Sequence, residues 1–176
     1  MMQMLVAGGM EALTDDLRHP DADNPRGYFE YEPVKRTRQD ASWVALAVGK
    51  VVKVVHLLLN DLPDGFEYRV VMMKRPIREV MASQRVMMER AGKTALGISE
   101  DRLARVFSEQ IRVVEEQILW RVGFRVLSAE YHDCVYRAGE VVGALRGFLG
   151  LELNAVAMED AVDCSLHRHR CRYSAP

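Results

Sequence analysis

The sequence predicts an α/β fold in which helices flank a parallel β-sheet. Two apolar runs rich in β-branched residues, Val51–Leu57 and Tyr68–Met73, are typical of parallel strands that are covered on both faces. A third strand candidate, Phe124–Leu127, comes after two helical patterns. Because strands separated by helices favour a parallel sheet, ligands are expected beyond the carboxyl ends of its strands.

The N-terminal third of the chain is predicted to contain two helices and a long loop. Residues 1–13 are apolar and suit a helix, whereas residues 14–29 are rich in Asp, Pro, Asn and Gly. That composition is typical of a loop, and a loop of this length in a compact domain is often functional. A polar helix is expected over residues 32–43.

Helical patterns dominate the remainder of the chain. One helix is predicted from Pro76 to about Arg90, and Ser99 is a favourable N-cap for a long helix that reaches about Val122. Further helices are expected over residues 138–149 and, as a short segment, over residues 155–161. Residues 165–176 form a basic tail whose composition also suits a disordered segment.

Length and composition exclude several classes of protein. The 176 residues fit one domain, so residues 1–176 are interpreted as a single unit. A net charge of −1 argues against nucleic-acid or membrane-surface binding. No apolar run approaches the roughly 20 residues that cross a bilayer. Three irregularly spaced cysteines do not form a disulfide framework, which predicts reduced thiols and a cytoplasmic protein.

The block from Met73 to Ser83 is the strongest candidate for an anion-binding site. Arg75 follows a strand candidate, Pro76 suits a first helical position, and Ser83 lies eight positions after Arg75. A helix start offers unpaired N–H groups and a positive dipole end, and an arginine adds charge and a fork of donors. We predict phosphate binding here; a solvated arginine and a surface serine are the structural alternative.

Lys53 and His56 are candidates for a catalytic role near the end of the first strand candidate. A histidine at a strand end that faces a ligand can act as a general base near neutral pH. A lysine in an apolar strand is unusual because lysine is rarely buried without a partner. A histidine in the core and a lysine at an exposed strand start are the structural alternatives.

Glu30 is a second candidate for a general base. It ends the loop segment Asn24–Glu30, directly after Tyr28 and Phe29. A carboxylate held beside aromatic rings can abstract a proton, and Glu32 is the fallback candidate. The structural alternative is a turn that leads into a helix, with both aromatic rings in the core.

The tail segment His167–Arg172 alternates histidine or cysteine with arginine. No metal site is expected there, because three arginines interleaved with the ligands would repel a cation. Arg168 and Arg170 are instead candidates for a basic arm that closes over an anionic ligand, and a disordered tail is an equal alternative. His132 and Cys134 lack a neighbouring base and are assigned structural roles.

In their order along the chain, these motifs resemble the sulfotransferases that use phosphoadenosine phosphosulfate. The Arg75–Ser83 block is similar to the segment that holds the 3′-phosphate of that co-substrate. The run with Lys53 and His56 resembles the lysine-containing strand of the family, and the loop that ends at Glu30 is similar to that of bacterial members. The strand–helix unit that begins Tyr131-His132-Asp133-Cys134 and the closing segment from Val162 to Arg170 also resemble bacterial members.

The resemblance implies a P-loop-like fold and transfer of a sulfuryl group to a hydroxyl or amine, without a metal ion. The acceptor would be a small molecule or a peptide. The residues that would bind phosphoadenosine phosphosulfate are Arg75, Ser83, Arg168 and Arg170. Lys53 would neutralise the leaving phosphate, and Glu30 or His56 would deprotonate the acceptor, with Glu30 preferred.

One part of the family pattern is missing. A loop of the Pro-Arg-Ser-Gly-Thr-Ser type should bind the 5′-phosphosulfate just before the first helix, which here starts at Met1. The chain is therefore expected to be N-terminally truncated or to have lost cofactor activation, with turnover lowered by several orders of magnitude. Exposed sheet edges would favour poor stability or self-association into homo-oligomers.

Two other classes of protein are compatible with the sequence. A non-catalytic, sulfotransferase-like remnant or interaction module would keep the helices and have no activity. A P-loop nucleotide kinase would bind a nucleoside triphosphate and Mg²⁺, but its Gly-rich loop is also missing and no acidic metal pair stands out.

Overall fold

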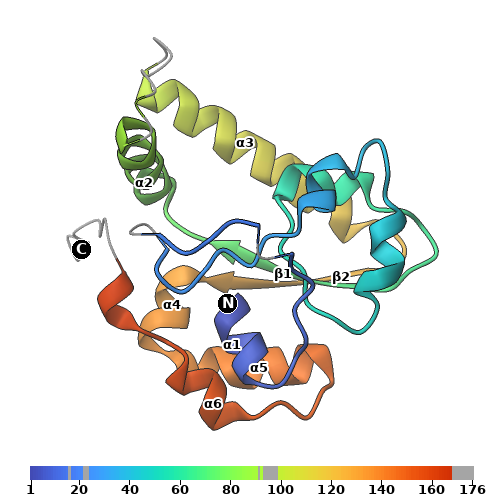
Figure 1. Ribbon diagram of the computed structural model, residues 1–176. Coiled ribbons are helices and arrows are strands. Elements are labelled where there is room, and N and C mark those ends of the chain that lie inside the picture. Colours follow the sequence, from blue (N-terminus) through green and yellow to red (C-terminus); the bar gives the residue numbers. More distant parts are fainter. Residues whose placement is uncertain (16, 22–23, 91, 93–98, 168–176) are drawn as a thin grey trace.

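The computed structural model describes the whole chain except residues 16, 22–23, 91, 93–98 and 168–176 (Figure 1). The predicted α/β class is confirmed at the level of helices around a small parallel sheet. In chain order the elements are α1 (Met2–Ala7), the 3₁₀ helices η1 (Glu32–Arg36), η2 (Ser42–Ala47) and η3 (His56–Asp61), β1 (Tyr68–Lys74), α2 (Ile77–Arg90), α3 (Glu100–Leu119), β2 (Phe124–Glu130), α4 (Tyr131–Tyr136), α5 (Ala138–Leu149), α6 (Ala155–Asp160) and the 3₁₀ helix η4 (Cys164–Leu166).

The sheet of the described residues consists of β1 and β2, paired in parallel from Tyr68 opposite Phe124 to Lys74 opposite Glu130. Parallel neighbours need a crossover connection, and α2 and α3 provide it. The rings of Tyr68 and Phe124 stack with centroids 4.5 Å apart at the start of the pair. The carboxyl ends of both strands therefore lie at the same edge, where β1 leads into α2 and β2 into α4.

The prediction of a strand over Val51–Leu57 was wrong. Val51 makes an isolated parallel bridge with Ala12, residues 52–55 have no regular structure, and η3 begins at His56. The bridge consists of two hydrogen bonds around Val51. The N–H of Leu13 donates to the carbonyl of Val51, and the N–H of Val51 donates to the carbonyl of Glu11. Residues with high β-propensity do not form a longer strand here, because only the short segment around Ala12 is available to pair with them.

The helices expected in the first third of the chain are also shorter than predicted. α1 ends at Ala7, because Gly9 takes a positive φ of 108° that breaks the helical path. Residues 32–43 contain η1 and the start of η2 in place of one helix. The connection between them turns at Asp40, whose carboxylate accepts a hydrogen bond from the N–H of Ser42.

The later helices agree with the sequence pattern. α5 ends where Gly150 adopts the left-handed conformation at φ 65°, and Asn154 caps α6 by accepting a hydrogen bond from the N–H of Ala157. Ser99 occupies the N-cap position of α3, although its side chain makes no capping hydrogen bond. β2 extends to Glu130, three residues beyond the predicted strand end.

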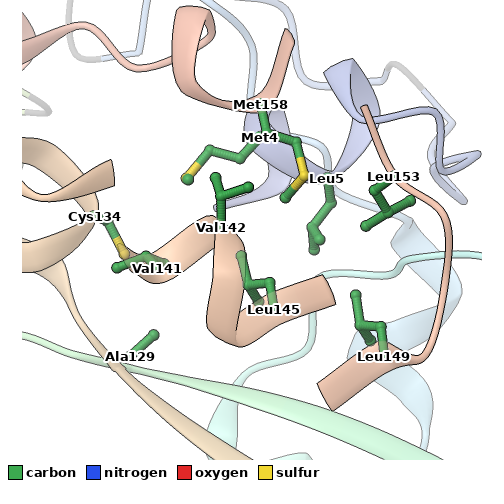
Figure 2. Close-up of a cluster of buried hydrophobic side chains, with 10 residues drawn as sticks. All are labelled: Met4, Leu5, Ala129, Cys134, Val141, Val142, Leu145, Leu149, Leu153 and Met158. Carbon is green, nitrogen blue, oxygen red and sulfur yellow. The ribbon is translucent and has the colours of Figure 1, made fainter. Parts of the chain in front are cut away.

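Two hydrophobic clusters lie on opposite faces of the strand pair. Figure 1 shows α1, α5 and α6 on one side of β1 and β2, and α3 on the other. The first cluster, shown in Figure 2, joins α1, α4, α5, α6 and β2 through Met4, Leu5, Ala129, Cys134, Val141, Val142, Leu145, Leu149, Leu153 and Met158. The second joins the 3₁₀ segments, β1 and α3 through Val34, Trp43, Val44, Leu59, Leu62, Met72, Val114 and Ile118.

Close packing holds α1 against α6 in the first cluster. A Cβ atom on Gly8 would lie 2.7 Å from Cγ of Met158, which is fully buried. Met4 points into the same cluster (Figure 2). Among the described residues, no helix combines the length and the apolar character that crossing a membrane requires.

Ile118 and Leu119 offer a matched test of the second cluster, because they are consecutive in α3 and differ in burial. Ile118 is 0% exposed and Leu119 is 60% exposed. We expect Ile118→Ala to lower the free energy of unfolding by about 2–5 kcal/mol, since it leaves a cavity in the core. Leu119→Ala should change it by less than about 0.5 kcal/mol, as is usual at the surface. Urea unfolding measures both values, and similar losses in the two variants would contradict this packing.

Candidate functional site

Arg75 lies at the carboxyl end of the strand pair, between the last residue of β1 and the start of α2. Its Nε atom donates a 2.9 Å hydrogen bond to Oε2 of Glu79, and its guanidinium carbon lies 4.6 Å from the ring centroid of Tyr131. The arginine side chain is 23% exposed, whereas Glu79 is completely buried. The guanidinium of Arg75 is therefore held by contacts with Glu79 and Tyr131, while part of its surface remains exposed to solvent.

The other residues of the predicted anion-binding block occupy different environments. Ser83 lies in the second turn of α2 and is partly buried, about 9 Å along the helix axis from Ile77. Lys74 is paired with Glu115 of α3 at 3.1 Å, and Arg78 is exposed. The structure thus places a strand end, an arginine and a helix start together, as predicted.

Glu30 and Lys53 are brought together although 23 residues separate them. Nζ of Lys53 lies 3.3 Å from Oε1 of Glu30 and donates a 3.1 Å hydrogen bond to the carbonyl of Tyr28. Arg18 also binds Oε1 of Glu30, at 3.0 Å, and Lys35 lies 3.8 Å from Oε2. The Glu30 side chain is 21% exposed, so this carboxylate is bounded by three cations and remains open to solvent.

A pocket of about 340 Å³ opens beside Glu30 and is lined by Thr14, residues 18–20 and residues 26–30. Arg18 lies over the ring of Tyr28, with 3.4 Å between the guanidinium carbon and the ring centroid. Phe29 has a positive φ of 51°, which is uncommon for a residue other than glycine. Such local strain is often found at binding sites, and here it lies directly before Glu30.

His56 is separate from that pair. It begins η3, and Nε2 of its ring is buried without a hydrogen-bond partner among the described residues. Burial lowers the pKa of His56, so its ring is neutral at pH 7. The expected position at a strand end was wrong, because this part of the chain forms a 3₁₀ helix. The predicted basic arm, Arg168 and Arg170, lies outside the described residues.

Sequence reasoning missed a buried polar cluster next to Arg75. Nε2 of His167 lies 3.5 Å from Oε2 of Glu79, and Nε2 of His132 lies 4.0 Å from its Oε1. Tyr136 Oη and Nδ1 of His167 are 3.0 Å apart. Burial lowers the pKa of His167, and the neighbouring carboxylate of Glu79 opposes this shift. We refer to Glu79, His132 and His167 as the buried His–Glu cluster.

Only part of this cluster carried a signal in the sequence. Glu79 stands four positions after Arg75, which is the spacing of a helical ion pair. His132 is the second residue of α4, after Tyr131, and its proximity to Glu79 depends on the parallel pairing of β1 and β2. His167 is 88 positions from Glu79, so no local pattern could connect them.

Arg26 connects the loop pocket with the C-terminal segment. It lines the pocket and donates hydrogen bonds of 2.9 Å to the carbonyl of Ala161 and to the carboxylate of Asp163. Asp163 in turn accepts from Ser165 at the start of η4, which leads to His167. Residues 161–167 thus contact both Arg26, which lines the pocket, and Glu79 of the buried His–Glu cluster.

Comparisons of the chain with protein-family models, with curated proteins and with solved structures gave no match.

The two carboxylates of this region should differ in their contribution to stability. We expect Glu30→Gln to change the free energy of unfolding by about 1 kcal/mol or less, because its ion pairs are partly exposed. Glu79→Gln should cost about 1–3 kcal/mol, since it removes the buried negative charge that pairs with Arg75. Urea unfolding at pH 7 measures both, and a larger loss for Glu30→Gln would contradict this ranking.

His56 predicts a dependence of stability on pH. Its folded pKa is lowered by burial, so below the unfolded value of about 6.5 the unfolded chain binds a proton that the folded chain rejects. The stability that the folded protein has with His56 neutral is fully present above about pH 6.5 and is lost as the pH falls through the folded pKa of His56. We expect the wild type to lose more stability than His56→Gln between pH 7 and pH 5.

Chemical unfolding at several pH values tests this difference. His19→Gln is the control, because His19 is exposed in the loop and should leave the wild-type slope unchanged. Equal slopes for the wild type and His56→Gln would show that His56 does not contribute.

Proposed function

We propose that this chain is a sulfotransferase-like domain that binds the 3′-phosphate of phosphoadenosine phosphosulfate at the junction of β1 and α2. The observation that carries the proposal is the position of Arg75, directly after a parallel strand and before a 14-residue helix. This combination places a guanidinium and the positive end of a helix dipole at one point, which suits a phosphate group.

Glu79 holds the side chain of Arg75 in an orientation that suits phosphate binding. Its buried carboxylate binds Nε, and the ring of Tyr131 covers one face of the guanidinium. Both contacts restrict the rotamer of the arginine, which reduces the entropy lost when an anion binds. Ser83 would add a neutral hydroxyl donor from the second turn of α2. Arg168 and Arg170 are proposed as further contacts to the same co-substrate.

The acceptor would occupy the loop pocket beside Glu30. In the proposed transfer, Glu30 takes the proton of an acceptor hydroxyl or amine as the new bond to sulfur forms. The bond between sulfur and the bridging oxygen of the phosphosulfate breaks, and adenosine 3′,5′-bisphosphate leaves. Lys53, 3.3 Å from Glu30, would stabilise the negative charge on that departing oxygen. Glu30 is preferred over His56 because it lines a pocket and is paired with Lys53.

A non-catalytic interaction module is the second candidate, and one observation favours it. The ion pair between Arg75 and Glu79 satisfies the arginine within the protein, so Arg75 also suits a purely structural role. In this alternative the junction holds the fold together and binds no nucleotide. A cytoplasmic location, self-association and the P-loop-like fold stay predictions of the sequence.

Calorimetry with adenosine 3′,5′-bisphosphate distinguishes the two candidates. We expect Arg75→Ala to weaken binding by about 10-fold or more, the usual effect of losing hydrogen bonds to a charged group. Arg78→Ala is the matched control, because Arg78 is exposed on the same helix and should have a smaller effect. Ser83→Ala should weaken binding by about 2- to 10-fold.

Two outcomes would overturn this proposal. Equal affinities of the wild type and Arg75→Ala would remove Arg75 from the phosphate site. Absence of binding to the folded wild type would favour the interaction module. Circular dichroism of each variant establishes that it is folded before its affinity is compared.

A further inference from the structure

We propose that the buried His–Glu cluster of Glu79, His132 and His167 is a binding site for a divalent transition-metal ion such as Zn²⁺. Each residue offers one ligand atom, and these three atoms all lie within 4.8 Å of one another. They come from α2, from α4 and from the residue after η4, so the fold itself assembles the site. This inference does not depend on the proposed sulfotransferase activity.

The donor set suits the chemistry of zinc. Two imidazole nitrogens and one carboxylate oxygen form a common three-residue set for Zn²⁺, with a fourth position left to water or another ligand. Bonds of about 2.0–2.1 Å in a tetrahedron require ligand atoms roughly 3.3 Å apart. Nε2 of His167 lies 3.5 Å from Oε2 of Glu79, which is close to this value. Nε2 of His132 lies 4.0 Å from the other carboxylate oxygen, Oε1, so the carboxylate and His132 must rotate to share one ion.

The surroundings hold the ligands in suitable orientations. Tyr136 Oη contacts Nδ1 of His167 at 3.0 Å, which fixes the ring with Nε2 directed toward the carboxylate. The edge-to-face contact of the two histidine rings, with centroids 4.9 Å apart, restricts His132 in the same way. Partners of this kind are typical of the second layer of residues around bound metal ions.

Burial and access are also consistent with a metal site. Glu79 and His167 have fully buried side chains, whereas that of His132 is 38% exposed. His132 is thus the member of the cluster that reaches solvent, while its Nε2 atom is buried beside a carboxylate that is shielded from water. Buried carboxylates require compensation by a cation, and a metal would add to the compensation that Arg75 provides.

Arg75 is the charged neighbour that limits the affinity. Its guanidinium binds Oε2 of Glu79, so it competes electrostatically with an ion on the same carboxylate. We therefore expect weaker binding than at a closed site with four protein ligands. Since Arg75 is also the proposed phosphate contact, metal and nucleotide affinities would be coupled reciprocally if both proposals hold.

Calorimetric titration of the metal-free, untagged chain with Zn²⁺ tests the site. We expect one ion per chain, and at least about 10-fold weaker binding in His132→Gln and in His167→Gln. His19→Gln and Cys164→Ser are the controls, because both residues are exposed and lie outside the cluster. Zn²⁺ should raise the melting temperature of the wild type and both controls more than that of the cluster variants.

The proposal is overturned if the wild type does not bind Zn²⁺, or if His132→Gln binds it as tightly as the wild type. It is equally overturned if a control loses as much affinity as the cluster variants. His132→Gln decides the matter where His167→Gln fails to fold, because His132 is partly exposed and tolerates substitution better. Tyr136→Phe keeps all three ligands and should weaken binding less than His132→Gln.

Discussion

The parallel pairing of β1 with β2 is the constraint on which the rest of the structure depends. Two parallel neighbours cannot be joined by a tight turn, so α2 and α3 must form the crossover between them. Side chains alternate between the two faces of the pair, which requires a separate hydrophobic cluster on each face. Parallel alignment also places both carboxyl ends at one edge, where Arg75 and Tyr131 meet.

The burial of Glu79 is the main electrostatic consequence of this arrangement. A carboxylate removed from water is unfavourable unless cations or hydrogen-bond donors surround it. Arg75 meets that need from the junction of β1 and α2, and the two histidines bring α4 and the segment after η4 to the same point. One buried charge thus organises three parts of the chain that are far apart in sequence.

The loop that carries Glu30 is held by partly exposed polar contacts rather than by a buried charge. Its polar groups are partly exposed and are connected by ion pairs, which contribute little to stability individually. The loop nevertheless adopts a defined path, since Arg26 bonds the C-terminal segment and Tyr28 donates to the carboxylate of Asp21. The pocket beside Glu30 is therefore maintained by polar contacts rather than by core packing.

The sequence by itself determined the elements whose signals are local. The helical period of residues 100–119, Gly150 at the end of α5 and the apolar run of β1 each depend on neighbours within a few positions. The block around Arg75 was predictable for the same reason. Charge and composition likewise limited the class of protein before any fold was known.

Tertiary structure alone decided which distant residues meet. The run at Val51–Leu57 has strand propensity but lacks a full-length neighbour, so most of it forms a 3₁₀ helix or irregular backbone. The contacts of Lys53 with Glu30 and of His167 with Glu79 span 23 and 88 positions. Such contacts depend on how the chain folds back on itself, which local propensity and periodicity do not encode.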